Sequence, residues 1–521
     1  MGEHRELERT LEAPPDWALP DLAAVAALRV AGVHAAVELE PVDLDAIYLD
    51  TEDLRLLAHG ATLRRRTGGG EDGWHLKLPA GDGSRTELQR PLDAGADPLA
   101  EPVPPDLAAL VTGLALGATL EPVARLVTRR VVTDLHSKSG DSLVTVARDE
   151  VRAEALIDAD GDPGWDEIEV EATGGTDALL DTVVEALAGA GATVASSRPK
   201  LARALGATGE RPALSDDPTA GDVVRLYLRE QVDELIARDP DVRRDVPDAV
   251  HQARVATRRL RSALATFRPV LGRDATEPLR AELAWWGGVL GIARDAEVRR
   301  DRLAEAVDDL PGTLVRGTVR EDLVEGASTE YREAWRIAVE KQSGPRYLAL
   351  LRELDAFAAD PPFTARARRP ARKELRRHVR RARRRVVSRH RAAFAGHGEP
   401  RGELLHDTRK AAKRARYAAE AVEPVFGHRA RLLARRMNAV QDALGAQHDA
   451  IELAELLRRE ALAAEASGQP SAETPEQSAE TTPAIAESTG AMSIGFKPEF
   501  GVAGSAYTPV QVTPSVPDYT V

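Results

Sequence analysis

The hydrophobic pattern changes its period once along the chain, near residues 206–218, and this change limits the domains that the chain can form. Before it, short runs alternate apolar and polar side chains with a period of two, as β-strands do. After it, up to about residue 465, apolar residues recur with the helical period of 3.6, and Ala, Leu and Arg dominate. We therefore expect a strand-rich domain over 1–205, a linker over 206–218 and an all-helical domain over 219–465.

The strand-rich part contains runs that clusters of Gly, Asp and Pro separate as turns. The expected strands are Glu3–Leu11, Asp45–Thr51, Thr62–Thr67, Gly73–Leu78, Ser84–Arg90, Leu126–Leu135, Ser142–Arg152 and Trp165–Ala172. Two Ala- and Leu-rich stretches, at about 20–32 and 176–190, indicate helices. This pattern predicts an α+β fold dominated by an antiparallel sheet or barrel.

Charge is divided along the chain in the same way as the hydrophobic period. Residues 1–210 carry 19 basic and 38 acidic residues, whereas residues 211–465 carry 50 basic and 40 acidic ones. The remaining 466–521 is rich in Ser, Thr, Pro and Glu, and we expect a disordered tail there. An acidic half joined to a basic half calls for a separate function in each.

Several classes of protein are excluded by what the sequence lacks. It contains no cysteine, which rules out disulfide scaffolds, thiolate metal sites and cysteine nucleophiles. It has no run of about 18 apolar residues and no apolar signal segment near its start. We therefore expect a soluble, cytoplasmic protein with no membrane partner.

Charged side chains of both signs share one face in six of the expected strands. One interpretation is an ordinary sheet with its polar face in water. The other is a closed barrel with a charged lumen, in which buried charges need partners. Arg and Lys neutralise phosphate oxygens, and carboxylates hold Mg²⁺ or Mn²⁺, so a lumen of mixed sign suits a metal–oligophosphate.

The motifs of this half resemble those of the CYTH, or triphosphate tunnel metalloenzyme, family. They are Glu6-Leu7-Glu8, Leu63-Arg64-Arg65-Arg66, Lys77, Asp149, Glu167-Ile168-Glu169 and Ser197-Arg198-Pro199-Lys200. The resemblance implies an eight-stranded antiparallel tunnel with flanking helices, which hydrolyses or rearranges triphosphate compounds with a divalent cation.

The resemblance also implies roles for individual residues. Glu6, Glu8 and Asp149 would be catalytic, and Glu6, Glu8, Glu167 and Glu169 would bind the metal, Mg²⁺ or Mn²⁺. The phosphate-binding residues would be Arg64, Arg66, Lys77, Arg129 and Lys200, with Arg125 and Arg130 as alternatives to Arg129. One departure stands out, because Thr10 replaces the lysine of the family signature Glu-x-Glu-x-Lys. An active triphosphatase, a tunnel that only binds its ligand and a nucleotide cyclase therefore all stay open.

The helical half contains an internal duplication. The segment 250–261 aligns with 405–416 at an offset of 155, and Leu290-Gly291 with its Asp295 aligns with Leu444-Gly445 and Asp449 at an offset of 154. In both copies a basic stripe lies opposite a face of small apolar residues. The stripe residues are His251, Arg254, Arg258, Arg259 and Arg261, and His406, Arg409, Lys410, Lys413, Arg414 and Arg416.

A solvated helix face is the ordinary explanation of such a stripe, but it normally interleaves acids with the bases. Arg254–Arg261 contains no acid, and Arg366–Arg385 holds twelve basic residues against the single acid Glu374. Such a surface attracts a polyanion. Aromatic residues make up only 4% of the chain, which does not favour single-stranded nucleic acid.

These motifs resemble the CHAD domain. The resemblance implies two pseudo-symmetric four-helix bundles, here about 219–355 and 366–465, with a basic surface that binds inorganic polyphosphate. Asp295 and Asp449 would be structural, and the two histidines would either bind phosphate or pack. The expected functions are hydrolysis of inorganic triphosphate or short polyphosphate with polyphosphate binding, or polyphosphate binding and granule targeting without catalysis.

Overall fold

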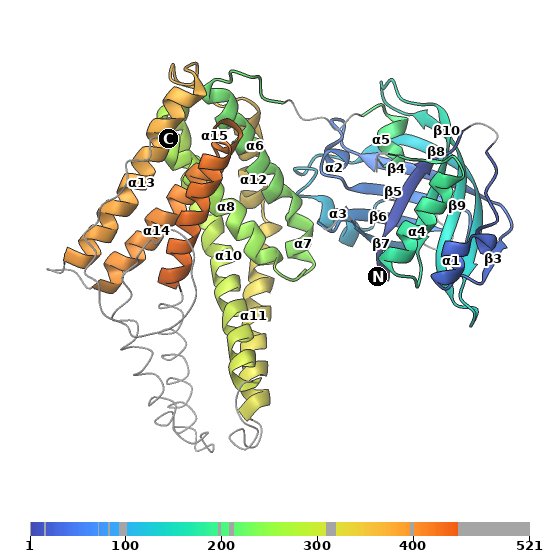
Figure 1. Cartoon of the computed structure of the whole chain (residues 1–521). Helices are drawn as coiled ribbons and strands as arrows, with labels where there is room; N and C mark the ends of the chain where they lie inside the picture. Colours follow the sequence, from blue (N-terminus) through green and yellow to red (C-terminus); the bar gives the residue numbers. More distant parts are fainter. Residues whose placement is uncertain are drawn as a thin grey trace, which may run out of the picture. The chain divides into compact units, whose positions relative to one another are not determined.

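Strands fill the first part of the chain and helices fill the second (Figure 1). The structure is a computed structural model that describes residues 2–14, 17–70, 72–81, 84–92, 102–195, 199–207, 213–308, 319–395 and 401–445. Contacts divide the chain into two units, which are described here one at a time. The first holds 1–213 with 233–249 and 343–352, and the second holds 214–232, 250–342 and 353–521.

One antiparallel sheet forms the body of the first unit. Its strands are β1 (Gly2–Glu6), β2 (Glu8–Glu12), β3 (Ala35–Glu38), β4 (Val42–Asp50), β5 (Thr62–Thr67), β6 (Gly73–Pro79), β7 (Arg85–Pro91), β8 (Glu121–His136), β9 (Ser142–Ala155), β10 (Gly164–Ala172) and β11 (Thr193–Val194). They run in the order β1-β7-β6-β5-β4-β8-β9-β10-β2-β11, and β3 pairs with β8. All eight expected strands are confirmed, and each shifts by a few residues at most at its ends, except β8 and β9, which extend further.

The N-terminal segment closes this sheet into a barrel. β1 pairs with β7, and β2 pairs with β10 at the other end of the strand order. Because only Leu7 separates β1 from β2, one continuous segment joins both edges of the sheet. Counted as one strand, it makes eight with β4 to β10, as expected, while β3 and β11 are short additions.

The two faces of the barrel wall differ in polarity. On the outside, a buried apolar cluster joins Leu11, Val146 and Ile168 of the sheet to Leu180 and Val183 of α4. The helices of this unit are η1 (Leu22–Ala24), α1 (Ala26–Val30), α2 (Arg55–Ala58), α3 (Pro105–Val111), α4 (Asp177–Gly189) and α5 (Lys200–Ala204). The strand faces that carry Glu8, Arg64, Lys77 and Glu167 therefore point inward, and the interpretation of these faces as solvated is wrong.

The remainder of the described chain is helical, as expected. Its helices are α6 (Ala220–Ala237), α7 (Asp239–Arg243), α8 (Ala249–Thr266), α9 (Arg268–Leu271), α10 (Arg273–Asp308), α11 (Val319–Gln342), α12 (Pro345–Ala359), α13 (Ala371–Ala395), α14 (Arg401–Glu420) and α15 (Glu423–Phe426), followed by a helix over 428–445. Within the described ranges, no helix is long and apolar enough to cross a bilayer.

The short helices α9 and α15 support the duplication. Each has Pro near its start and ends at a glycine with positive φ, Gly272 at 87° and Gly427 at 54°. The two glycines differ by 155 positions, the offset that relates the two basic stripes. The end of the second copy, with Asp449, lies outside the described residues, and so does the expected disordered tail 466–521.

Candidate functional site

Three carboxylates from two neighbouring strands meet inside the barrel. Glu167 of β10 lies directly opposite Asp149 of β9, and Glu169 follows two residues later on the same face. One carboxylate oxygen from each of the three residues lies within 4.8 Å of the other two. Asp149 is only 2% exposed and Glu167 only 6%, so this acidic group is enclosed by the protein.

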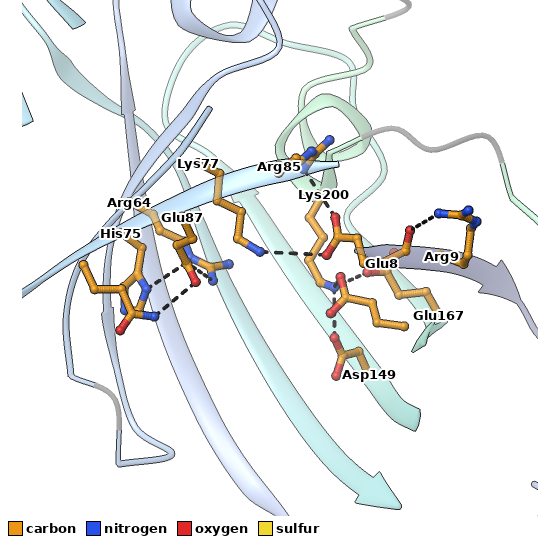
Figure 2. A network of polar contacts seen from close by, with 12 residues as sticks. Glu8, Arg9, Arg64, His75, Lys77, Arg85, Glu87, Asp149, Glu167 and Lys200 are labelled. Carbon is orange, nitrogen blue, oxygen red and sulfur yellow. Dashed lines mark hydrogen bonds and ion pairs between the residues drawn. The ribbon is translucent and has the colours of Figure 1, made fainter. Parts of the chain in front are cut away.

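Two cations neutralise the acidic group. Lys200, the first residue of α5, places its Nζ 2.9 Å from Asp149 Oδ2 and 2.6 Å from Glu169 Oε1, and it also contacts Glu167 (Figure 2). Arg130 of β8 donates from Nε and Nη2 to the two oxygens of Asp149 at 2.7 and 2.6 Å, and it contacts Glu169. Such pairing is what buried carboxylates require.

The two glutamates have pKa values shifted in opposite directions. Burial raises the pKa of Glu167, and this outweighs the opposing attraction of Lys200. Burial alone would also raise the pKa of Glu169, but Lys200, Arg130 and Lys77 outweigh it and hold that pKa well below its usual value. Glu169 is therefore the more firmly ionised of the pair.

Basic residues line the facing part of the lumen (Figure 2). Arg85 Nη1 lies 3.5 Å and Lys77 Nζ 3.8 Å from the two carboxylate oxygens of Glu8. Arg64 donates to the hydroxyl of Tyr48 at 3.1 Å. A small cavity of about 30 Å³ lies among these groups. Its lining residues are Glu8, Thr10, Tyr48, Thr62, Arg64, Lys77, Arg85, Glu167, Glu169, Pro199 and Lys200.

A buried pair lies beside this basic wall. His75 Nδ1 is 2.9 Å from Glu87 Oε1, and Gln89 donates to Glu87 Oε2 at 3.1 Å. Arg64 Nη2 lies 3.8 Å from the same glutamate. Glu87 thus holds the Arg64 guanidinium beside the cavity.

The acidic group has the chemistry of a divalent-cation site. Hard carboxylate oxygens are the ligands that Mg²⁺ and Mn²⁺ prefer. Asp149, Glu167 and Glu169 supply three such groups at a spacing that can hold one ion. The Lys200 ammonium lies among the same oxygens, so it would compete with a cation for them.

Most of the predicted tunnel residues meet at this cavity. Glu8, Arg64, Lys77, Glu167, Glu169 and Lys200 line it, and Asp149 pairs with Lys200. Arg66 is buried two residues along β5 from Arg64, outside the lining of the cavity. Glu6 ends β1, but its side chain lies outside the described residues.

The prediction of Arg129 is corrected by the structure. Arg129 is exposed, and its neighbour Arg130 faces Asp149 directly across β8 and β9. The cause is strand alternation, since adjacent residues point to opposite faces. Arg85 and Tyr48 line the cavity but were not predicted as site residues. The alternation of charges signalled Arg85, because it lies two residues before Glu87 on the same strand face.

In the second unit, the two basic stripes face each other through α8 and α14. Arg258 and Lys413 are equivalent positions of the duplication, and they lie close enough for each to act on the other's charge. We call Arg254, Arg258, Arg409 and Lys413 the central cluster. Burial, and then Arg258, Arg409, Arg254 and Arg416, lower the pKa of Lys413 to about 8.

Two glycines explain the second motif of the duplication. A Cβ on Gly291 would lie 3.5 Å from the Arg254 guanidinium, and one on Gly445 would lie 3.1 Å from that of Arg409. Arg254 and Arg409 therefore each lie over a glycine of the next long helix in their own copy. Asp295 pairs with Arg254 Nη1 at 3.0 Å.

The other stripe residues differ in their surroundings. Arg259 and Arg416 both bond to Glu420, at 3.2 and 2.7 Å. Arg261 and Arg414 lie on α8 and α14 next to further arginines. His251 is half-buried, and His406 and Lys410 are exposed on the same helices.

Comparison with known proteins was consistent with this division. Residues 22–203 match the CYTH domain family, and residues 226–458 match the CHAD domain family. Rv2226 of Mycobacterium tuberculosis (strain ATCC 25618 / H37Rv) is 36% identical over 482 residues, which cover 89% of this chain and 90% of that protein. MT2285 of strain CDC 1551 / Oshkosh gives the same identity and coverage.

Among solved structures, the CHAD domain from the plant Ricinus communis is 22% identical and has a TM-score of 0.40. The match covers 54% of this chain and 90% of that one. HpAC1 from Hippeastrum, which is described as an adenylyl cyclase homologue with a dominant triphosphatase activity, is 17% identical with a TM-score of 0.21. That match covers 38% of this chain and 93% of the other.

Proposed function

Because the chain belongs to the family in which a CYTH domain precedes a CHAD domain, we propose that its tunnel hydrolyses inorganic triphosphate or short polyphosphate with a divalent cation. We further propose that the helical domain binds inorganic polyphosphate, which would place the protein on polyphosphate granules. The observation that carries the first proposal is the enclosed group of three carboxylates facing a basic wall in one lumen.

The arrangement suggests a division of labour inside the tunnel. Arg64, Lys77 and Arg85 would bind phosphate oxygens, since guanidinium and ammonium groups match them in charge and geometry. Asp149, Glu167 and Glu169 would hold Mg²⁺ or Mn²⁺, with Glu8 completing the set from β2. When bound, the cation would neutralise phosphate charge and lower the pKa of a bound water.

The central cluster supports the second proposal. The Nε atoms of Arg258 and Arg409 are buried without a hydrogen-bond partner, although each is a strong donor. These two arginines and Lys413 repel one another, which raises the free energy of the unbound protein. A bound polyanion would remove this repulsion. Linear polyphosphate supplies one negative charge per phosphate along a flexible chain, which suits a row of cations.

Release of phosphate from inorganic triphosphate, with Mg²⁺ or Mn²⁺ added, tests the tunnel. We expect turnover that depends on the metal and falls about 100-fold in Glu8→Gln, which removes one carboxylate charge from the cavity. Glu150→Gln is the matched control, because Glu150 follows Asp149 on β9 but is exposed. It should leave turnover unchanged.

The main alternative is a tunnel that binds without hydrolysis, and Thr10 is the observation that favours it. Thr10 stands where the family signature has a lysine, so the lumen has lost one ammonium. Calorimetry separates the two functions. Tight binding of triphosphate with no phosphate release under any metal would reject hydrolysis and leave the binding function.

A further inference from the structure

The duplication gives the central cluster two equivalent flanks. At the offset of 155, Arg259 corresponds to Arg414 and Arg261 corresponds to Arg416. The pair Arg261 and Arg414 forms one flank, and the pair Arg259 and Arg416 forms the other. If the two copies had kept the same neighbours, both flanks would carry the same charge.

One flank has an acid for each of its two arginines, because Glu420 bonds to both and Asp442 also acts on the charge of Arg416. Glu420 accepts from Arg259 Nε at 3.2 Å and from Arg416 Nε at 2.7 Å. Both guanidinium groups also lie over the ring of Tyr417, at 5.8 and 5.7 Å from its centre. We call Arg259, Arg416, Tyr417 and Glu420 the neutral flank, because the donors of its arginines already have an anionic and an aromatic partner.

The other flank lacks these partners. The positions equivalent to Glu420 and Tyr417 are Ala265 and Ser262, which offer no negative charge and no ring. Arg414 is surrounded instead by four arginines that lie close enough to act on its charge. They are Arg261, Arg268, Arg280 and Arg385, and with Arg414 we call them the cationic flank.

Little acid compensates the cationic flank. Glu277 bonds to Arg268 at 2.9 Å and to Arg280 at 2.8 Å, and it is the one acid that bonds to these five arginines in the described part of the chain. The Nε atoms of Arg261, Arg268 and Arg280 are buried without a hydrogen-bond partner. Burial, and then the four neighbouring arginines, lower the pKa of Arg414.

These five guanidinium groups lie close together although their charges repel one another and three of their buried Nε donors have no hydrogen-bond partner. Such a group suits an anion with many oxygens. We infer that polyphosphate leaves the central cluster over the cationic flank alone, and that Arg268, Arg280 and Arg385 extend the binding site there. The inference rests on the proposed binding of polyphosphate by the helical domain. It gives that domain a one-sided path, although its two stripes arose by duplication.

Equivalent substitutions on the two flanks test this inference in the full-length protein. Calorimetry with long-chain inorganic polyphosphate should show about tenfold weaker binding for Arg414→Gln. Arg259→Gln, the equivalent change on the neutral flank, should weaken binding twofold or less. Thermal unfolding of both variants checks folding, and Arg414→Gln should unfold at the same temperature as the unaltered protein or higher, since repulsion is relieved.

A third variant reverses the expected effect. Glu420→Gln frees Arg259 and Arg416 from their shared acid, so it should strengthen polyphosphate binding several-fold. Equal losses in Arg414→Gln and Arg259→Gln, with no gain in Glu420→Gln, would overturn the one-sided path while polyphosphate binding stood. Failure of the unaltered protein to bind polyphosphate would overturn the proposed function of the helical domain and this inference with it.

Discussion

Thr10 decides how much positive charge the tunnel can place beside Glu169. It lies directly opposite Glu169 in the pairing of β2 with β10, and it lines the cavity. Replacing it with lysine would put a further ammonium, besides those of Lys200 and Lys77, beside the carboxylates, where charges interact strongly because water is largely excluded. We expect Thr10→Lys to lower the KM for inorganic triphosphate about tenfold, as measured by phosphate release.

Thr10→Met is the control for this substitution, because it adds a chain of similar length without charge. A fall in KM that appears equally in Thr10→Met would assign the effect to shape. A rise in KM in Thr10→Lys alone would show that Lys200, Arg130 and Lys77 already supply all the positive charge that the carboxylates around Glu169 accept.

Single residues also show where sequence reasoning stops. Alternation along a strand identifies the residues that share a face. From it we predicted that Asp149, Glu167 and Lys77 lie in the lumen, and the structure places them there. It does not determine which of two adjacent arginines faces inward when the residues on either side of them are polar. Arg130, and not Arg129, therefore turned out to face Asp149. Contacts between distant segments, such as Glu420 with Arg259, leave no local signal at all.

At the scale of elements, the glycines of α10 and of the helix over 428–445 let stripe arginines lie close to the backbone. Gly445→Ala should shift the Arg409 guanidinium, because the added Cβ would lie 3.1 Å from it. We expect weaker polyphosphate binding, by about three- to tenfold in calorimetry.

Gly288→Ala is the matched control, because a Cβ there meets no atom within 4 Å. It should raise the unfolding temperature without changing affinity. A loss of affinity in Gly288→Ala equal to that in Gly445→Ala would contradict the role assigned to the second motif.

Elements were the best-predicted level of this molecule. Strand alternation and turn residues gave each main strand, since their local signals are strong. The separation of the N-terminal strand into β1 and β2 at Leu7 was not predicted, because each half pairs with a different, distant strand. The closeness of Arg409 to Gly445 was not predicted either, because the offsets of 155 and 154 align the two copies with each other and do not say which motifs touch within one copy.

For the whole molecule, the two proposed sites should respond differently to salt. The stripes of α8 and α14 form an array of mostly half-buried cations that solvent still reaches, so their attraction for polyphosphate depends on the ionic atmosphere. We expect the affinity for long-chain polyphosphate to fall at least about tenfold between 50 and 200 mM NaCl, whereas the KM of the enclosed tunnel changes less than about threefold. Titrations and phosphate-release assays across this range would measure both, and equal salt dependence would contradict the assignment of long chains to the helical domain.

The seam made by β1 and β2 has a consequence for how the protein forms. Glu8 is paired with Glu171, which the ribosome adds 163 positions later. The barrel therefore has a high contact order, and β2 must wait unpaired until β10 has been synthesised, although β1 can pair earlier with β7. The tunnel therefore closes only after β10 has been made, whereas its acidic group lies on the neighbouring strands β9 and β10 and can assemble within that hairpin.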